Sequence, residues 1–118
     1  METNNYKQIF SGLETNLKVF DGLLSNVAES EQKWTPEPGK WSLLEIVCHL
    51  RDEEQEDFRA RVLHVLERPS EALPKINPEA WVSERRYIDQ SYRTSLQIFF
   101  EERKKSLEIL RSLKSPKW

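Results

Sequence analysis

The chain has 118 residues, which suits one domain with a core of its own. Its 18 basic and 20 acidic residues are mixed along the sequence, with a formal net charge of −2, which excludes the basic field that nucleic-acid binding requires. One cysteine excludes an intramolecular disulfide, and no apolar run approaches the ~20 residues that cross a membrane, so a soluble cytoplasmic protein is expected. A charged fraction of 32% with only three glycines favours an all-α protein, organised as a single domain over residues 1–118.

A first helix is predicted over residues 5–28. Apolar residues recur there at steps of three and four and form one stripe: Tyr6, Phe10, Leu13, Leu17, Phe20, Leu24 and Val27. The pattern then stops, and Pro36 and Pro38 cannot continue a helix because proline lacks an amide donor. Residues 29–42 are therefore predicted to be a loop.

The second helix, predicted over residues 43–67, has a well-marked start. Ser42 is its expected N-cap, and Glu45 stands three residues later, so the two side chains can form a capping box. Trp41 and Ile46 occupy the positions of a hydrophobic staple across the same turn. The beginning of this helix is thus fixed to about one residue.

One charged residue interrupts the apolar stripe of the second helix. The stripe is formed by Leu43, Val47, Leu50, Phe58, Val62 and Val65, and Glu54 falls on it. Pro69 ends the helix, and residues 68–87 are predicted to be a long connection in which Pro78 opens one short turn containing Trp81.

The third helix is predicted over residues 88–113, and a charged residue, Arg103, lies on its apolar stripe. Because Glu54 and Arg103 each lie near the middle of a helix, we hypothesise that they meet inside the bundle as an ion pair that fixes the helix register. The three helices are predicted to form an up-down bundle. Either they close as three, or a second copy of the chain covers the remaining apolar face, which predicts a homodimer.

His49 is the residue that points most directly to chemistry. A lone histidine among apolar residues is more often packed than metal-bound, but Glu45, Asp52 and Glu53 lie one helical turn away. These carboxylates can orient the ring or join it at a metal ion. The other histidine, His64, lies fifteen residues further on, roughly 22 Å along a helix, so the two cannot bind one ion within a monomer.

Cys48 adjoins His49, which raises the question of a catalytic pair. Consecutive residues on a helix point about 100° apart and do not face each other. Cys48 is therefore interpreted as a small buried apolar side chain. Phosphate-binding glycine loops, nucleophile elbows and paired-cysteine metal motifs are missing from the sequence.

The order of these residues resembles the DinB-like superfamily of helical-bundle proteins. The resemblance rests on Lys40-Trp41-Ser42, Glu45, His49-Leu50, Asp52 and Glu54, followed by Phe58 and Arg61. Further along it includes Leu73-Pro74, Asn77-Pro78, Trp81, Phe99 and Arg103. It spans the whole chain.

The resemblance implies a four-helix bundle in which three histidines hold a divalent metal, nickel or zinc, for a metal-dependent hydrolase or thiol transferase acting on small molecules. Only the first histidine carries over, to His49, which is thereby a predicted metal ligand. Glu54, if it faces the cavity, would either support the metal ligands or act as an acid–base residue. The other two histidines belong to a fourth helix that would follow Trp118, so the chain resembles a member that lacks this helix.

Two interpretations stay open at this stage. In the first, the chain is an enzyme whose metal is held by His49 with nearby carboxylates or with ligands from another subunit. In the second, it binds no metal and is a non-catalytic helical module for association with itself or with another protein. The substrate and the reaction cannot be read from the sequence.

Overall fold

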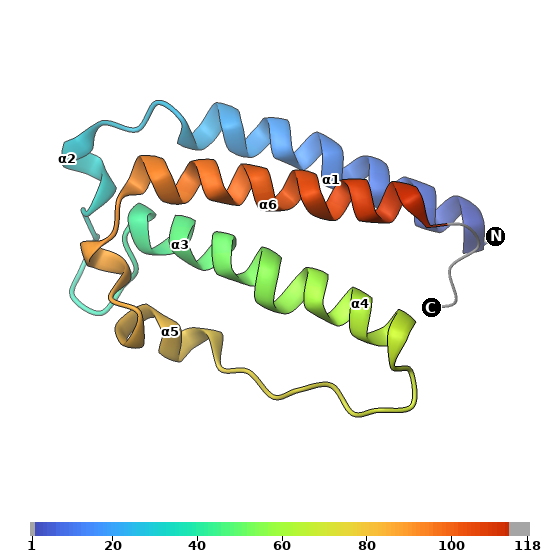
Figure 1. Ribbon diagram of the computed structural model, residues 1–118. Helices are drawn as coiled ribbons and strands as arrows, with labels where there is room; N and C mark the ends of the chain where they lie inside the picture. The colour runs from blue at the N-terminus through green and yellow to red at the C-terminus, as the bar shows by residue number, and fades with distance from the viewer. Residues whose placement is uncertain (1, 114–118) are drawn as a thin grey trace.

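The computed structural model describes residues 2–113 and is helical throughout, with no strand in this range (Figure 1). Its three long helices confirm the predicted all-α class. They are α1 (Glu2–Leu24), the continuous run of α3 (Leu43–Glu53), η1 (Glu54–Arg59) and α4 (Ala60–Glu67), and α6 (Tyr92–Ser112). Shorter helices lie in the connections: α2 (Glu29–Gln32), α5 (Pro78–Glu84) and η2 (Tyr87–Asp89).

Helix α6 lies between α1 and the α3–η1–α4 run and packs against both (Figure 1). Its first residue, Tyr92, donates a hydrogen bond of 2.7 Å to the carbonyl oxygen of Leu24, the last residue of α1, so these two helices are antiparallel. The aromatic rings of Phe20 and Phe99 pack edge to face between them, with centroids 5.4 Å apart.

The predicted up-down order holds for the first two long helices but not for the third. Side chains of Arg51 and Arg59 contact Ser95 and Glu102 respectively, so residue numbers rise in the same direction along both helices. The physical reason is the long second connection, which returns the chain along the outside of α4 and α3 before α6 begins (Figure 1). Helix α6 is therefore parallel to α3.

The apolar core is concentrated where α3 and α6 begin. Its buried residues come from α1, α3, α5, η2 and α6: Leu24, Leu44, Val47, Cys48, Trp81, Tyr87, Tyr92, Leu96 and Phe99. Helix α5 and η2 cover this end, which explains why Trp81 and Tyr87 are buried although they lie in a connection. By contrast, α4 contributes no fully buried residue.

The predicted bounds of the first and third helices differ from the structure, most of all at the end of the first and the start of the third. The first helix ends at Leu24 rather than residue 28, where the hydroxyl of Tyr92 binds the free carbonyl group. The third begins at Tyr92 rather than residue 88, because Ser91 caps it by accepting a hydrogen bond of 3.2 Å from the amide of Thr94. Pro78 opens the short helix with Trp81 as predicted. The predicted segment after residue 113, including Trp118, lies outside the described residues.

A π-helix, η1, occupies the middle of the second long helix and was not predicted. Its six residues, Glu54–Arg59, are less tightly wound than an α-helix, so a side chain five positions later returns to the same side. This places both Glu54 and Arg59 against α6, where they contact Arg103 and Glu102 respectively. An uninterrupted α-helix would have turned one of them away.

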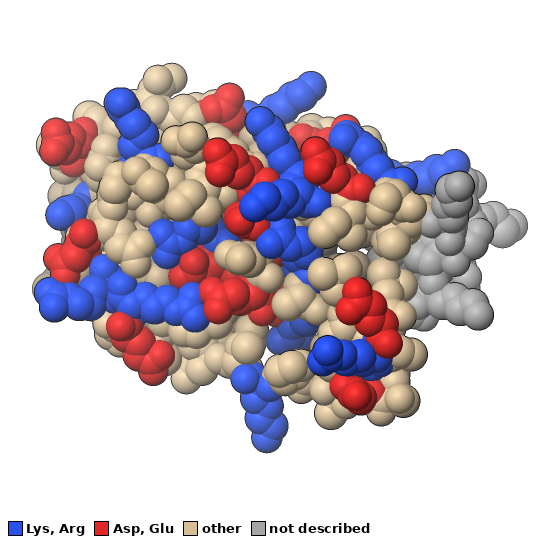
Figure 2. Space-filling model, viewed as in Figure 1, with Lys and Arg blue, Asp and Glu red and all other residues tan. Residues whose placement is uncertain are grey.

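Charged side chains of both signs alternate over the face shown in Figure 2, which presents no broad field of one sign. Within residues 2–113, every helix is either too short or too polar to span a lipid bilayer.

Candidate functional site

His49 is presented by a helix whose start is fixed by its cap. The hydroxyl of Ser42 accepts a hydrogen bond of 3.2 Å from the amide of Glu45, whose carboxylate accepts one of 3.0 Å from the amide of Ser42. The predicted capping box is therefore confirmed. It orients α3 so that Val47 and Cys48 enter the core while His49 stays at its edge.

The imidazole of His49 lies between an aromatic ring and a carboxylate. Its ring centroid is 4.9 Å from that of Trp41, and its Nε2 atom lies 3.3 Å from Oε1 of Glu53, one helical turn later. The side chain of His49 is 23% exposed and that of Glu53 is 33% exposed, so both are reachable from solvent. The other ring nitrogen, Nδ1, is buried without a hydrogen-bond partner among the residues that the structure describes.

The environment of Glu53 makes its ionisation less favourable than in water. Burial raises the pKa of the Glu53 carboxyl, and the neighbouring Asp57 raises it further, while His49 acts in the opposite direction. Asp57 itself pairs with Arg61 on the same face of the helix. A positive charge placed between His49 and Glu53 would relieve this unfavourable environment.

The separation of His49 and Glu53 suits two ligands of one metal ion. Two donors at bond lengths near 2.1 Å from a tetrahedral ion are roughly 3.4 Å apart, close to what this pair shows. No group of three or more histidine, cysteine, aspartate or glutamate side chains within residues 2–113 is arranged to hold a metal ion. The pair therefore supplies two donors of the three or four that a divalent ion requires.

Glu54 lies against α6 and forms an ion pair with Arg103. Its side chain is 2% exposed, and Oε1 accepts a hydrogen bond of 2.7 Å from Nε of Arg103. Arg103 also donates to the carbonyl oxygen of Leu13 at 3.3 Å, so the pair connects all three long helices. The predicted ion pair is confirmed, whereas the acid–base role of Glu54 stays a prediction.

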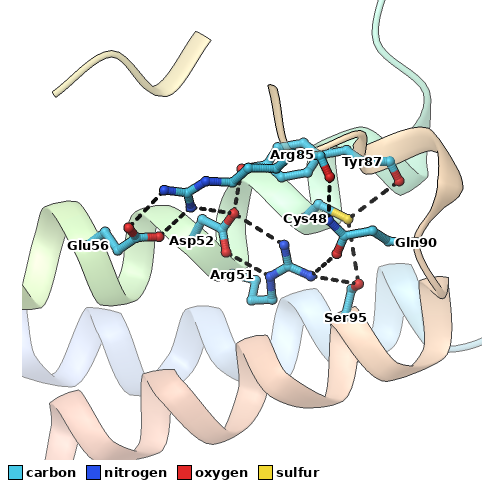
Figure 3. Close-up of polar contacts among 8 residues, drawn as sticks. All are labelled: Cys48, Arg51, Asp52, Glu56, Arg85, Tyr87, Gln90 and Ser95. Atoms are coloured by element: carbon cyan, nitrogen blue, oxygen red, sulfur yellow. Dashed lines mark hydrogen bonds and ion pairs between the residues drawn. The ribbon is translucent and has the colours of Figure 1, made fainter. Parts of the chain in front are cut away.

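Asp52 is the centre of a larger polar network, drawn in Figure 3. Its carboxylate accepts hydrogen bonds from Nε of Arg51 at 2.8 Å, from the hydroxyl of Tyr87 at 2.6 Å and from Nη1 of Arg85 at 3.0 Å. Arg51 continues to Gln90 and Ser95, at 2.6 and 3.0 Å. The network thus connects α3 to the segment around η2 and to α6.

Arg85 is held from several sides within this network. Its Nη2 donates to Glu56 at 2.9 Å, and its guanidinium carbon lies 4.1 Å from the ring centroid of Trp81. Hydrogen bonding to Glu56 raises the pKa of Arg85 most strongly. Arg85 is therefore always positively charged, and its contact with Glu56 links the C-terminal end of α5 to η1.

The network shifts the titration of Asp52 and Tyr87 in opposite directions. Burial alone would raise the pKa of Asp52, but hydrogen bonds from Arg51, Tyr87 and Arg85 outweigh burial and hold it below its ordinary value. Burial raises the pKa of Tyr87, and its bond to the Asp52 carboxylate raises it further. Asp52 is thus an ionised acceptor and Tyr87 a neutral donor near neutral pH.

Cys48 is buried in the core, as predicted, and points away from His49. Its sulfur lies 3.5 Å from the hydroxyl oxygen of Ser95 and 4.0 Å from the carbonyl oxygen of Tyr87 (Figure 3). Burial raises the pKa of the thiol. The environment favours the neutral thiol, so a catalytic pair with His49 is not formed.

A family model described as the DinB superfamily matches residues 13–118. The chain belongs to the DinB superfamily. The predicted resemblance is confirmed by this match, which covers nearly the whole chain. Comparison with curated proteins and with solved structures gave no match.

In this DinB-superfamily chain, the partners of Asp52 were missed from the sequence, although one signal pointed to them. Asp52 follows the buried Cys48 by four residues and therefore lies on the same face of α3. A carboxylate at such a position requires donors. Arg85 and Tyr87 supply them from a segment that has no periodic pattern, so pattern analysis could not identify them.

Proposed function

We propose that this DinB-superfamily bundle binds a divalent metal ion, nickel or zinc, through Nε2 of His49 and a carboxylate oxygen of Glu53. The observation that carries the proposal is the 3.3 Å separation of these two atoms at a solvent-accessible position. The remaining ligands come from outside the described residues, from a second copy of the chain or from water. The proposed activity is hydrolysis or thiol transfer on a small molecule.

In this proposal, the residues around His49 position its ring and supply charge for the metal. The ring of Trp41 holds the imidazole plane, and the capped start of α3 fixes the backbone from which it projects. Glu53 supplies a negative charge that a bound cation would neutralise. The metal, when bound, would act as a Lewis acid or lower the pKa of a bound water or thiol.

Metal binding is tested by titrating the protein with cobalt, nickel and zinc, using calorimetry and the visible absorption of cobalt. We expect His49→Ala to abolish measurable binding, because it removes a donor, and Glu53→Gln to weaken it by about tenfold, because a neutral amide replaces the charged carboxylate. His64→Ala is the matched control and should bind as the unmodified protein does. Equal affinity in His49→Ala and the unmodified protein would refute the proposed site.

The enzymatic part of the proposal has its own readout. Metal-loaded protein is assayed with a chromogenic ester for hydrolysis and with a thiol plus an aryl halide for thiol transfer. Activity should disappear with chelator, return with nickel or zinc, and be absent in His49→Ala. Metal binding without activity on either probe would leave the metal site standing and count against these two reaction classes.

A second candidate function, self-association, is favoured by the surface of α1. Ile9, Val19 and Leu23 are 66%, 50% and 69% exposed. At about 100° per residue they lie within roughly 80° of each other, beside the stripe that packs on α6. An apolar area of this kind on one helix suits a partner helix, and a homodimer would supply it.

Sedimentation velocity tests the homodimer over a range of micromolar concentrations. Leu23→Lys should shift the species from dimer to monomer, because it places a charge in the proposed interface. Ile88→Lys, at another exposed apolar position, is the matched control and should remain dimeric. A monomer at all concentrations in the unmodified protein would exclude this second function.

A further inference from the structure

A pocket of about 320 Å³ lies between α4 and the extended segment that follows it, a position that the proposed metal site does not use. Its apolar walls are formed by Leu63 on the helix and by Leu73, Pro74 and Ile76 on the segment. His64 also lines the pocket, fifteen residues after His49 and thus roughly 22 Å away along the helix. The volume is at the lower end of the range for small-molecule sites.

The segment that closes this pocket is fixed at several points. Nε2 of His64 lies 3.0 Å from the carbonyl oxygen of Glu71, and the amide of Glu71 donates to the carbonyl oxygen of Arg68 at 3.1 Å. Pro69 and Pro74 restrict the backbone on either side of Glu71. These contacts keep the segment beside the end of α4.

The hydrogen bond to Glu71 determines what His64 offers to a ligand. A carbonyl oxygen only accepts, so Nε2 carries the hydrogen, and Nδ1 of the neutral ring is an acceptor. Among the residues that the structure describes, Nδ1 of His64 has no hydrogen-bond partner. A ligand in the pocket would meet apolar walls, the imidazole of His64 and charged side chains from α4 and its end.

The charged residues around the pocket largely neutralise one another. Glu56 is paired with Arg85, and Arg61 is paired with Asp57. Glu67 and Arg68 are exposed at the rim with opposite charges. Because α4 ends at Glu67, the carbonyl ends of the helix disfavour an anion beside the pocket.

We propose that this pocket binds a small amphipathic molecule with an apolar body and a hydroxyl or amino group. The body packs against Leu63, Leu73 and Ile76, and the head group donates a hydrogen bond to Nδ1 of His64. Anionic analogues are disfavoured by the end of α4 and by the acceptor character of the imidazole. This site is separate from the proposed metal site at His49.

Three probes with the same six-carbon tail test the proposal: hexan-1-ol, hexylamine and hexanoate. Each is titrated into the full chain and followed by two-dimensional NMR of backbone amides and histidine rings. We expect hexan-1-ol or hexylamine to shift the signals of residues 60–76 and to bind at least about tenfold more tightly than hexanoate. The His49 signals should stay unchanged. If only hexanol or only hexylamine binds, that result identifies the head group.

Two variants distinguish recognition from general loosening of the segment. His64→Phe keeps a flat ring without nitrogens and should reduce the preference over hexanoate to the part that the end of α4 supplies, whereas a merely loosened segment would weaken all three probes equally. Leu73→Ser should weaken binding severalfold, and Leu23→Ser on α1 should leave it unchanged. Shifts absent from residues 60–76 with every probe, or an unchanged preference in His64→Phe, would overturn the proposal.

Discussion

At the scale of single residues, the pair formed by Glu54 and Arg103 places two charges in the interior of the bundle. Two charges are removed from water there, and each depends on the other for compensation. The second carboxylate oxygen, Oε2 of Glu54, has no hydrogen-bond partner within residues 2–113. The pair therefore fixes the register of the helices more than it stabilises the fold.

Replacing one member of this pair should cost more than replacing both. Glu54→Met is expected to lower the free energy of unfolding by about 3 to 5 kcal/mol, because Arg103 remains as an unpaired buried charge. The double variant Glu54→Met/Arg103→Met should recover most of this loss. Urea unfolding at pH 7 measures both, and Glu108→Met at an exposed position of α6 should change it by less than about 0.5 kcal/mol. Similar losses in the single and double variants would contradict this expectation.

Asp52 is expected to make the protein sensitive to acid. Its pKa is lower in the folded chain than in the unfolded chain, so its stabilising effect is complete above an ordinary pKa near ~3.9 and is lost as the pH falls through the folded value. Asp52→Asn should cost roughly 1 to 3 kcal/mol at pH 7 and reduce the decline in stability below about pH 4.

Urea midpoints measured from pH 7 down to pH 2.5 test this dependence. Tyr87→Phe is a suitable comparison, because it removes one donor to Asp52 and keeps the ring in the core. It should lose about 1 kcal/mol at pH 7 and keep most of the acid-dependent decline. An acid decline as steep in Asp52→Asn as in the unmodified chain would assign it to other carboxylates, such as Glu102, whose pKa is also lowered by Arg59 against the effect of burial.

At the scale of helices, the π-helix η1 contains one residue more than an α-helix would need to join α3 to α4. Deleting the exposed Gln55 should therefore restore an α-helix while α3 and α4 keep their faces toward α6. Deleting the exposed Gln97 in α6, which has no such bulge, would rotate Phe99 and Leu107 by about 100° out of their contacts.

The two deletions are compared by urea unfolding and far-ultraviolet circular dichroism. We expect the Gln55 deletion to stay folded with a loss of about 1 to 2 kcal/mol, and the Gln97 deletion to lose several kcal/mol or to unfold. Equal losses would show that η1 is required by its contacts rather than tolerated as an inserted residue.

Sequence patterns predicted helices well where the pattern is local. The capping box at Ser42 and the short helix opened by Pro78 are examples, because both depend on neighbouring residues. The stripe interruptions at Glu54 and Arg103 even predicted a contact between helices. The π-helix η1 was missed because its hydrogen-bond pattern requires no residue types that differ from those of an α-helix.

The candidate site was predictable only in part, for a related reason. His49 and the carboxylate one turn later, Glu53, lie on one helix, so helical spacing places them together. The partners of Asp52 come from residues 85–95, after a long connection, and their position depends on the packing of Trp81 and Tyr87. Spacing along the chain does not determine such an arrangement.

At the scale of the whole molecule, the three long helices lie with α6 in the middle, and the second long helix is held unequally along its length. Helix α3 contributes four buried residues, namely Leu44, Val47, Cys48 and Asp52, whereas α4 contributes none that is fully buried. Local opening should therefore cost less free energy at α4 and residues 68–77 than at the end that carries His49. The end formed by α4 and residues 68–77 can therefore change shape around a guest molecule, while the buried residues of α3 keep the fold intact.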